Sequence, residues 1–132
     1  MKNNLPKNLL KKVYWAFSKG DFASLAEFNE EVRDYHISIV EEDVWQPDLK
    51  VLNEPSIQIC FEYWTDEGDE LEEFIELTAD NSQFFTAGEL LFKINNATAD
   101  KLKNGDHIFF EGLNLSETLH NDKPFYWMYL GS

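Results

Sequence analysis

The stretch IQICFEYWTDEGDELEEFIELTA, residues 57–79, decides the fold because it carries two strand patterns on either side of a turn. Every second residue from Ile57 to Tyr63 is apolar, which is typical of a strand with one buried face. The run Asp66-Glu67-Gly68-Asp69 is a turn signal, and the next strand, around residues 73–79, directs apolar side chains inward. The sequence therefore predicts two consecutive antiparallel strands in the middle of the chain.

Further strands are expected on both sides of this pair. Upstream, apolar residues alternate over residues 35–39, and residues 49–52 allow a short strand. Downstream, residues 107–113 and 124–130 have strand character and are separated by a polar loop over residues 116–123. These segments together indicate an antiparallel meander.

Two helices are expected before the first strand. Apolar residues recur at helical spacing over residues 6–18, with Pro6 suited to the first turn and Gly20 to the end. A second helix is expected to start near Asp21 or Ser24, since Ser24 and Glu27 have the spacing of a capping box. The two would form an N-terminal helical hairpin.

A third helix has the best start signal in the sequence. Thr86 is an N-cap residue, and Glu89 follows it three positions later. The apolar stripe that begins at Leu90 continues past Asn95-Asn96, a possible break, toward a terminus at Asn104-Gly105. This helix would cover one face of the sheet.

The predicted fold class is α+β. An N-terminal helical hairpin and one central helix pack on a mainly antiparallel sheet of about five to six strands. The chain has 132 residues, of which 43% are hydrophobic, enough for one core. We therefore expect a single domain over residues 1–132.

Negative charge is concentrated in one segment. The formal net charge is -14, and residues 34–80 hold fifteen Asp or Glu against one Lys, whereas residues 1–33 and 81–132 sum to +2 and -2. Such a field repels phosphate groups and attracts a cationic partner. We therefore expect no binding to nucleic acid or to membranes. The alternative is an acidic surface that only aids solubility.

The sequence has no run of the roughly 20 apolar residues that a membrane helix needs, and its first residues lack the pattern of a secretory signal. We expect a cytoplasmic protein. Cys60 is the single cysteine, so neither a disulfide framework nor a cysteine-based zinc site can be built, and a buried structural thiol is expected.

No motif for a cofactor or for common enzyme chemistry is present, so no cofactor and no metal are expected. One candidate site is a pocket with His107 and Glu111. The two residues share a face of one predicted strand, with their Cα atoms about 13 Å apart. His107 could meet a carboxylate from a neighbouring strand, and such a pocket would suit a small hydrolase or isomerase. His36 and His120 are interpreted as surface residues.

Acidic residues in the middle of the chain are interleaved with large aromatic side chains. Charge would steer a partner over long range, and tryptophans would anchor the interface. The alternative is that Trp45 and Trp64 belong to the core and that the acidic run is an exposed loop. The residues expected to bind a partner are Glu41, Glu42, Asp43, Trp45, Glu62, Trp64, Asp66, Glu67, Asp69, Glu70, Glu72 and Glu73.

Three stretches carry a resemblance to a known group of proteins: TAGELLFKINN at residues 86–96, GDHIFFEGL at residues 105–113 and YLGS at residues 129–132. In these the chain resembles small bacterial proteins encoded beside polymorphic toxins, the setting in which immunity proteins are found. The resemblance covers about the last third of the chain and assigns no role to any residue. It implies an intracellular antidote that binds and blocks a toxin domain.

The leading hypothesis is therefore an acidic binding module, an immunity protein that occludes a basic toxin surface such as a nuclease active site. The first rival is the enzyme that uses His107 or Glu111. The second is a structural or regulatory homodimer built on residues 125–129, FYWMY, whose two faces are both apolar. Such a strand is either central in its sheet or covered by a partner.

Overall fold

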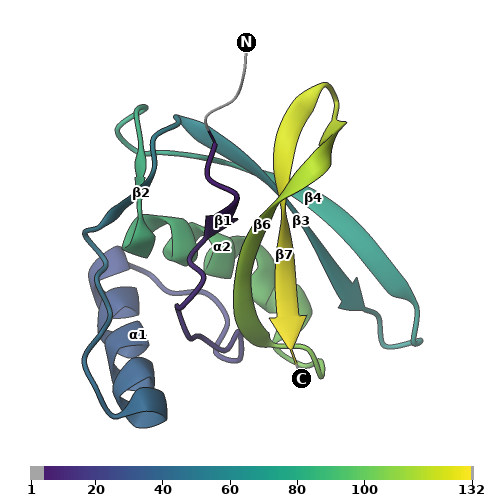
Figure 1. Cartoon of the computed structure of the whole chain (residues 1–132). Helices are drawn as coiled ribbons and strands as arrows, with labels where there is room; N and C mark the ends of the chain where they lie inside the picture. The colour runs from purple at the N-terminus through teal and green to yellow at the C-terminus, as the bar shows by residue number, and fades with distance from the viewer. Residues whose placement is uncertain (1–4, 132) are drawn as a thin grey trace.

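The fold is built on a mixed five-stranded sheet with two helices, seen in a computed structural model that describes residues 5–131 (Figure 1). The sheet has the order β1-β6-β7-β3-β4, and β2 and β5 form a separate two-stranded sheet. The elements are β1 (Asn8–Leu9), α1 (Leu25–Val40), β2 (Lys50–Leu52), β3 (Ser56–Trp64), β4 (Glu70–Thr78), β5 (Phe85–Thr86), α2 (Ala87–Leu102), β6 (Phe109–His120) and β7 (Lys123–Gly131). The α+β class is therefore confirmed.

The central strand pair forms as predicted. β3 and β4 are antiparallel over their full length, from Ser56 opposite Thr78 to Trp64 opposite Glu70. The Thr65 N–H donates to the Asp69 carbonyl at 2.9 Å and closes the turn, in which Gly68 adopts a φ of 89° that glycine accepts without strain. The hairpin is thus set by its alternating pattern and by its turn residues.

The final two strands form an antiparallel hairpin with a shorter connection than expected. β6 runs to His120 and β7 starts at Lys123, so most of the predicted polar loop belongs to strand β6. β7 also pairs in parallel with β3, through Ile59 with Tyr126 and Cys60 with Trp127. The sheet is therefore mixed, and β7 lies in its centre, which accounts for the two apolar faces of this strand.

α2 covers one face of the sheet and α1 packs on α2 (Figure 1). The Thr86 hydroxyl caps α2 by accepting the Glu89 N–H, as predicted. Leu90, Leu91 and Ile94 on the buried side of α2 are fully covered and share one core cluster with residues such as Ile59 and Phe61 of β3. Within residues 5–131, neither helix is long and apolar enough to cross a bilayer.

The predicted N-terminal helical hairpin was wrong, since α1 is the only helix before the β3–β4 hairpin in the described residues 5–131. Residues 6–18 instead run beside strand β6: β1 pairs with it, and the Phe110 N–H donates to the Trp15 carbonyl at 2.8 Å. Trp15 and Phe17 are buried from this extended segment. Its apolar residues suggested a helical face, but pairing with a strand nearly 100 residues away determines their conformation.

The strand predicted over residues 35–39 was also wrong, because these residues form the last turns of α1. Phe28, Val32 and His36, spaced four apart, are buried on one side of the helix, while Ile37 and Ile39 are exposed. The alternation of apolar residues was therefore a misleading signal within a helix whose inward face has a period near four. His36, interpreted as a surface residue, is 1% exposed.

Candidate functional site

Pairing of β3 with β4 gathers acidic side chains on the sheet face opposite α2. Directly paired residues of antiparallel strands point to the same side, so Glu62 lies beside Glu72, and Trp64 lies beside Glu70. All four are exposed, and Trp64 keeps 49% of its surface accessible. We call this surface the acidic face, made of Glu62, Trp64, Glu70, Glu72 and Glu76.

Charge on the acidic face is poorly compensated. Residues 56–78 contain eight Asp or Glu and no Lys or Arg. The Lys123 Nζ reaches one end of the face and lies 3.6 Å from a Glu76 carboxylate oxygen. Partial burial, with the negative charges of Glu70 and Glu72, raises the pKa of Glu62. The fold therefore holds like charges close together where a cationic group would be favourable.

Cys60 lies under this face and is fully buried. Burial, together with the nearby carboxylates of Glu72 and Glu62, raises the pKa of the thiol to about 12. The expected structural cysteine is thus found in the structure, and it stays protonated at neutral pH.

The turn between β3 and β4 extends the negative surface to the tip of the hairpin. Asp66, Glu67 and Asp69 are all exposed there. The Thr65 hydroxyl accepts the Asp69 N–H at 3.1 Å, and this bond holds the turn in shape. These three carboxylates therefore lie next to the acidic face and can act with it over a Debye length of about 8 Å.

Other predicted partner-binding residues lie elsewhere. Glu41, Glu42 and Asp43 follow the far end of α1, well away from the β3–β4 tip (Figure 1), and Asp43 pairs with Arg33 at 3.1 Å. Glu73 points to the α2 side of the sheet and forms an ion pair with Lys101. The acidic segment of the sequence is therefore divided by the fold into at least two surfaces.

Trp45 is not on the surface. It is 4% exposed and its ring lies 5.7 Å from that of His36, within the core. It cannot contact a partner in this structure, so we leave it out of the candidate site. Of the two tryptophans expected to be anchors, Trp64 is the accessible one.

A groove lies between the hairpin tip and the C-terminal end of α2. Its volume is about 620 Å³, and Trp64 lies on its wall. A smaller cavity of about 160 Å³ adjoins the acidic face beside Tyr129. His107 lines both cavities from the loop before β6, whereas Glu111 lines neither and lies against Gly131. The two residues of the alternative pocket are thus not brought into one cavity.

His120 stacks on Phe74, with ring centroids 3.5 Å apart, at the other end of this sheet face. It is part of an aromatic cluster with Phe125 and is half-buried, so the surface interpretation does not hold for it. Over the described residues, 5–131, no group of three His, Cys, Asp or Glu side chains could hold a metal ion.

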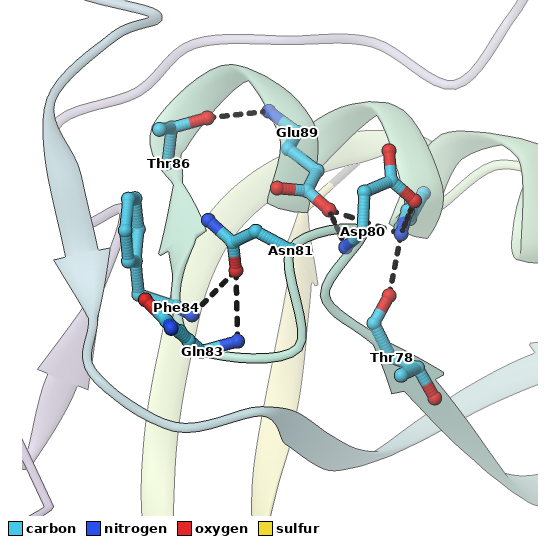
Figure 2. A network of polar contacts seen from close by, with 8 residues as sticks. Thr78, Asp80, Asn81, Gln83, Phe84, Thr86 and Glu89 are labelled. Atoms are coloured by element: carbon cyan, nitrogen blue, oxygen red, sulfur yellow. Dashed lines mark hydrogen bonds and ion pairs between the residues drawn. The ribbon is translucent and has the colours of Figure 1, made fainter.

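A polar network fixes the base of the hairpin to α2 (Figure 2). The Glu89 carboxylate accepts the Asp80 N–H at 2.7 Å, and Lys93 forms ion pairs with both Asp80 and Glu89. Lys93 also donates to the Thr78 carbonyl at the end of β4. In the next turn, the Asn81 Oδ1 accepts the N–H groups of Gln83 and Phe84. These contacts thereby tie the end of β4 to α2.

Sequence reasoning missed Glu76 and Lys93. Glu76 shares the alternation of Glu70 and Glu72, so the strand register could have placed it on the acidic face. Lys93 could have been found as the residue four positions after Glu89 on a predicted helix. Comparisons with family models, with curated proteins and with solved structures found no match to this chain.

Proposed function

We propose that this protein is an acidic binding module that docks a basic protein on the acidic face, and that it acts as an immunity protein which blocks a toxin domain. The observation that carries the proposal is the pairing of Glu62 with Glu72 and of Trp64 with Glu70 on an exposed sheet face. Like charges directly opposite each other destabilise a sheet by themselves. A cationic partner would relieve that repulsion on binding.

The chemistry of the face suits a protein better than other polyvalent ligands. Its carboxylates repel phosphate groups, which disfavours nucleic acid and anionic lipid. Trp64 offers an indole ring on which the side chain of Arg or Lys can lie, an arrangement favoured at interface centres. Partner charge would accelerate encounter, and the indole would contribute to the lifetime of the complex.

The test is neutralisation in cells. The chain is co-expressed with the C-terminal domain of the protein encoded by the adjacent gene, which the proposal expects to be a toxin, and growth is measured. Wild type should restore growth, and the triple variant Glu62→Lys, Glu70→Lys, Glu72→Lys should not. The matched control places the same change of charge on exposed positions of α1, as Glu27→Lys, Glu30→Lys and Asp34→Lys, and should protect like wild type.

Two results would contradict this proposal. If both triple variants protect equally, the acidic face is not the binding surface. If wild type gives no protection and no complex with that domain forms in a pull-down, the immunity function is excluded for this pair.

The second candidate function is a small hydrolase or isomerase that uses His107. The observation in its favour is the groove of about 620 Å³ in which His107 lies near Asp66, Lys101 and Asp106. Its test is a substrate screen in which His107→Ala is compared with Glu111→Gln. Activity lost in the first variant alone would favour this function, and equal activity in both would count against it.

A further inference from the structure

β4 is an edge strand of the sheet. Within the described part of the chain it pairs with β3 on one side, and no strand pairs with its other side. An edge of this length exposes a row of N–H and C=O groups that another strand can bind. Natural proteins usually shorten, bend or cover such an edge, but β4 keeps an unbroken register with β3 through nine residues.

The hydrogen-bond pattern shows which residues of β4 present these groups. The Thr65 N–H bonds to Asp69, and the Ala79 N–H bonds to Pro55, so both of these pairs are hydrogen-bonded pairs. Bonded and non-bonded pairs alternate along an antiparallel ladder. The backbone groups of residues 71, 73, 75 and 77 therefore face β3, and those of residues 70, 72, 74, 76 and 78 face outward.

An independent contact agrees with this assignment. Lys93 donates to the Thr78 carbonyl, which must therefore be turned away from β3. That contact occupies the end of the edge and leaves residues 70–76 free. The free segment has outward backbone groups on Glu70, Glu72, Phe74 and Glu76, the same residues whose side chains lie on the open face of the sheet.

We infer that β4 binds an extended segment of the basic partner as an additional strand, in which cationic and apolar residues alternate. This inference rests on the proposed function and names the form in which the partner binds. Every second residue of the added strand lies beside Glu70, Glu72 or Glu76, where Lys or Arg is favoured. The residues between them lie beside Leu71 and Ile75 on the other face of the sheet. Leu71 is 42% exposed, so an apolar side chain of the added strand is favoured beside it.

A second copy of this chain does not fit the same edge. Pairing β4 with itself would bring the carboxylates of Glu70, Glu72 and Glu76 from both copies against one another. Like charges opposite each other oppose pairing, and charged edges are a common protection against self-association. The edge is therefore suited to a strand of opposite charge.

The experiment measures binding of two capped peptides of lysine and valine by fluorescence anisotropy with the full chain. Both are about ten residues long, enough to span the free edge. One alternates lysine with valine, and the other has the same composition arranged in pairs of like residues. The alternating peptide should bind about tenfold more tightly or better. Equal affinity for both would overturn the added strand while leaving the acidic binding module intact.

Backbone methylation separates strand addition from charge attraction. Two versions of the alternating peptide carry N-methyl groups on every lysine or on every valine, because only one of the two sets turns its N–H groups toward β4. One version should lose at least about tenfold in affinity, and the other should bind like the parent. Equal losses, or no loss in either, would overturn the inference. Failure of all peptides to bind would count against the proposed function as well.

A substitution in the protein gives a second readout. Proline at position 72 removes an N–H that faces outward and leaves the ladder with β3 intact. Glu72→Pro should therefore weaken binding by about tenfold more than Glu72→Gln, which removes only the charge. Equal affinities of the two variants, with thermal unfolding showing that both are folded, would contradict the inference.

Discussion

His36 joins the extended N-terminal segment to α1 from inside the core. Its Nε2 accepts the Tyr14 N–H at 2.9 Å, and it packs against the rings of Tyr14 and Trp45. Burial lowers the pKa of His36, against an opposing attraction from Asp43. An accepting Nε2 carries no proton, so the folded protein holds this imidazole neutral.

The first prediction concerns pH. The pKa of His36 in the folded protein lies below its unfolded value of about 6.5. The neutral His36 side chain therefore contributes its full share of stability at any pH above about 6.5. This contribution is lost as pH falls toward the folded-state pKa, with a slope of up to about 1.4 kcal/mol per pH unit. Urea unfolding from pH 7 to 5 should show a shallower decline for His36→Gln than for wild type. Identical slopes would contradict this role.

The pair Asn95-Asn96 was a possible helix break in the sequence and is instead an internal link. The Asn95 Oδ1 accepts the Trp15 Nε1–H at 3.0 Å, and the Asn95 amide donates to the Gly20 carbonyl at 2.9 Å. Asn96 bonds to both backbone groups of Phe22. These contacts join distant parts of the chain, so no local pattern could have revealed them.

The second prediction follows from the burial of Asn95, which is 0% exposed. Asn95→Ala would leave the indole N–H of Trp15 and the carbonyl of Gly20 without partners. Each such buried group costs about 1–3 kcal/mol. Chemical denaturation should show a loss in that range or somewhat above it, whereas Asn104→Ala, at an exposed position, should lie within about 0.5 kcal/mol of wild type.

Among the elements, the segments predicted well are those whose local signals agree with their tertiary contacts. In β3 every second residue from Ile57 to Tyr63 is apolar, and α2 has both an N-cap and an apolar stripe. The predictions failed at residues 6–18 and 35–39. At residues 6–18 the apolar spacing is helical, but the segment pairs with β6; at residues 35–39 the apolar residues alternate, but the segment belongs to α1. Alternation in the sequence predicts which face of a strand a residue lies on. It does not predict that the acidic segment is divided between two surfaces, because that division depends on how the strands and α1 are arranged in space.

The third prediction concerns repulsion within the acidic hairpin. Glu62 and Glu72 are direct neighbours across the two strands, and like charges in that arrangement are destabilising. Glu72→Gln should therefore stabilise the protein by roughly 0.2–1 kcal/mol at neutral pH. The gain should shrink in about 1 M salt, where the Debye length falls to about 3 Å. A loss of stability in low salt would show that Glu72 has a favourable contact instead.

The charge of the whole molecule governs its association with itself as well as with a partner. Carboxylates on β4 oppose pairing of two copies at neutral pH. The central position of β7 already explains the apolar strand that suggested a homodimer.

The fourth prediction is therefore a change of oligomeric state when the charge of this edge is removed. At pH 7, light scattering should show a monomer for wild type and growing self-association for the variant with Glu70→Gln, Glu72→Gln and Glu76→Gln. A variant with Glu70→Lys, Glu72→Lys and Glu76→Lys carries positive charge on the same edge and should remain monomeric at the same concentrations. A stable dimer of wild type at neutral pH and low concentration would instead favour the homodimer function.

The parallel contact between β3 and β7 has a consequence for the order of events during synthesis. β3 ends at Trp64 and β7 starts at Lys123, so the centre of the sheet cannot close until some 60 further residues have left the ribosome. Until then the flank of β3 that pairs with β7 has no partner strand. The dense negative charge of the β3–β4 hairpin then has a second benefit, because nascent chains that repel one another are slow to aggregate.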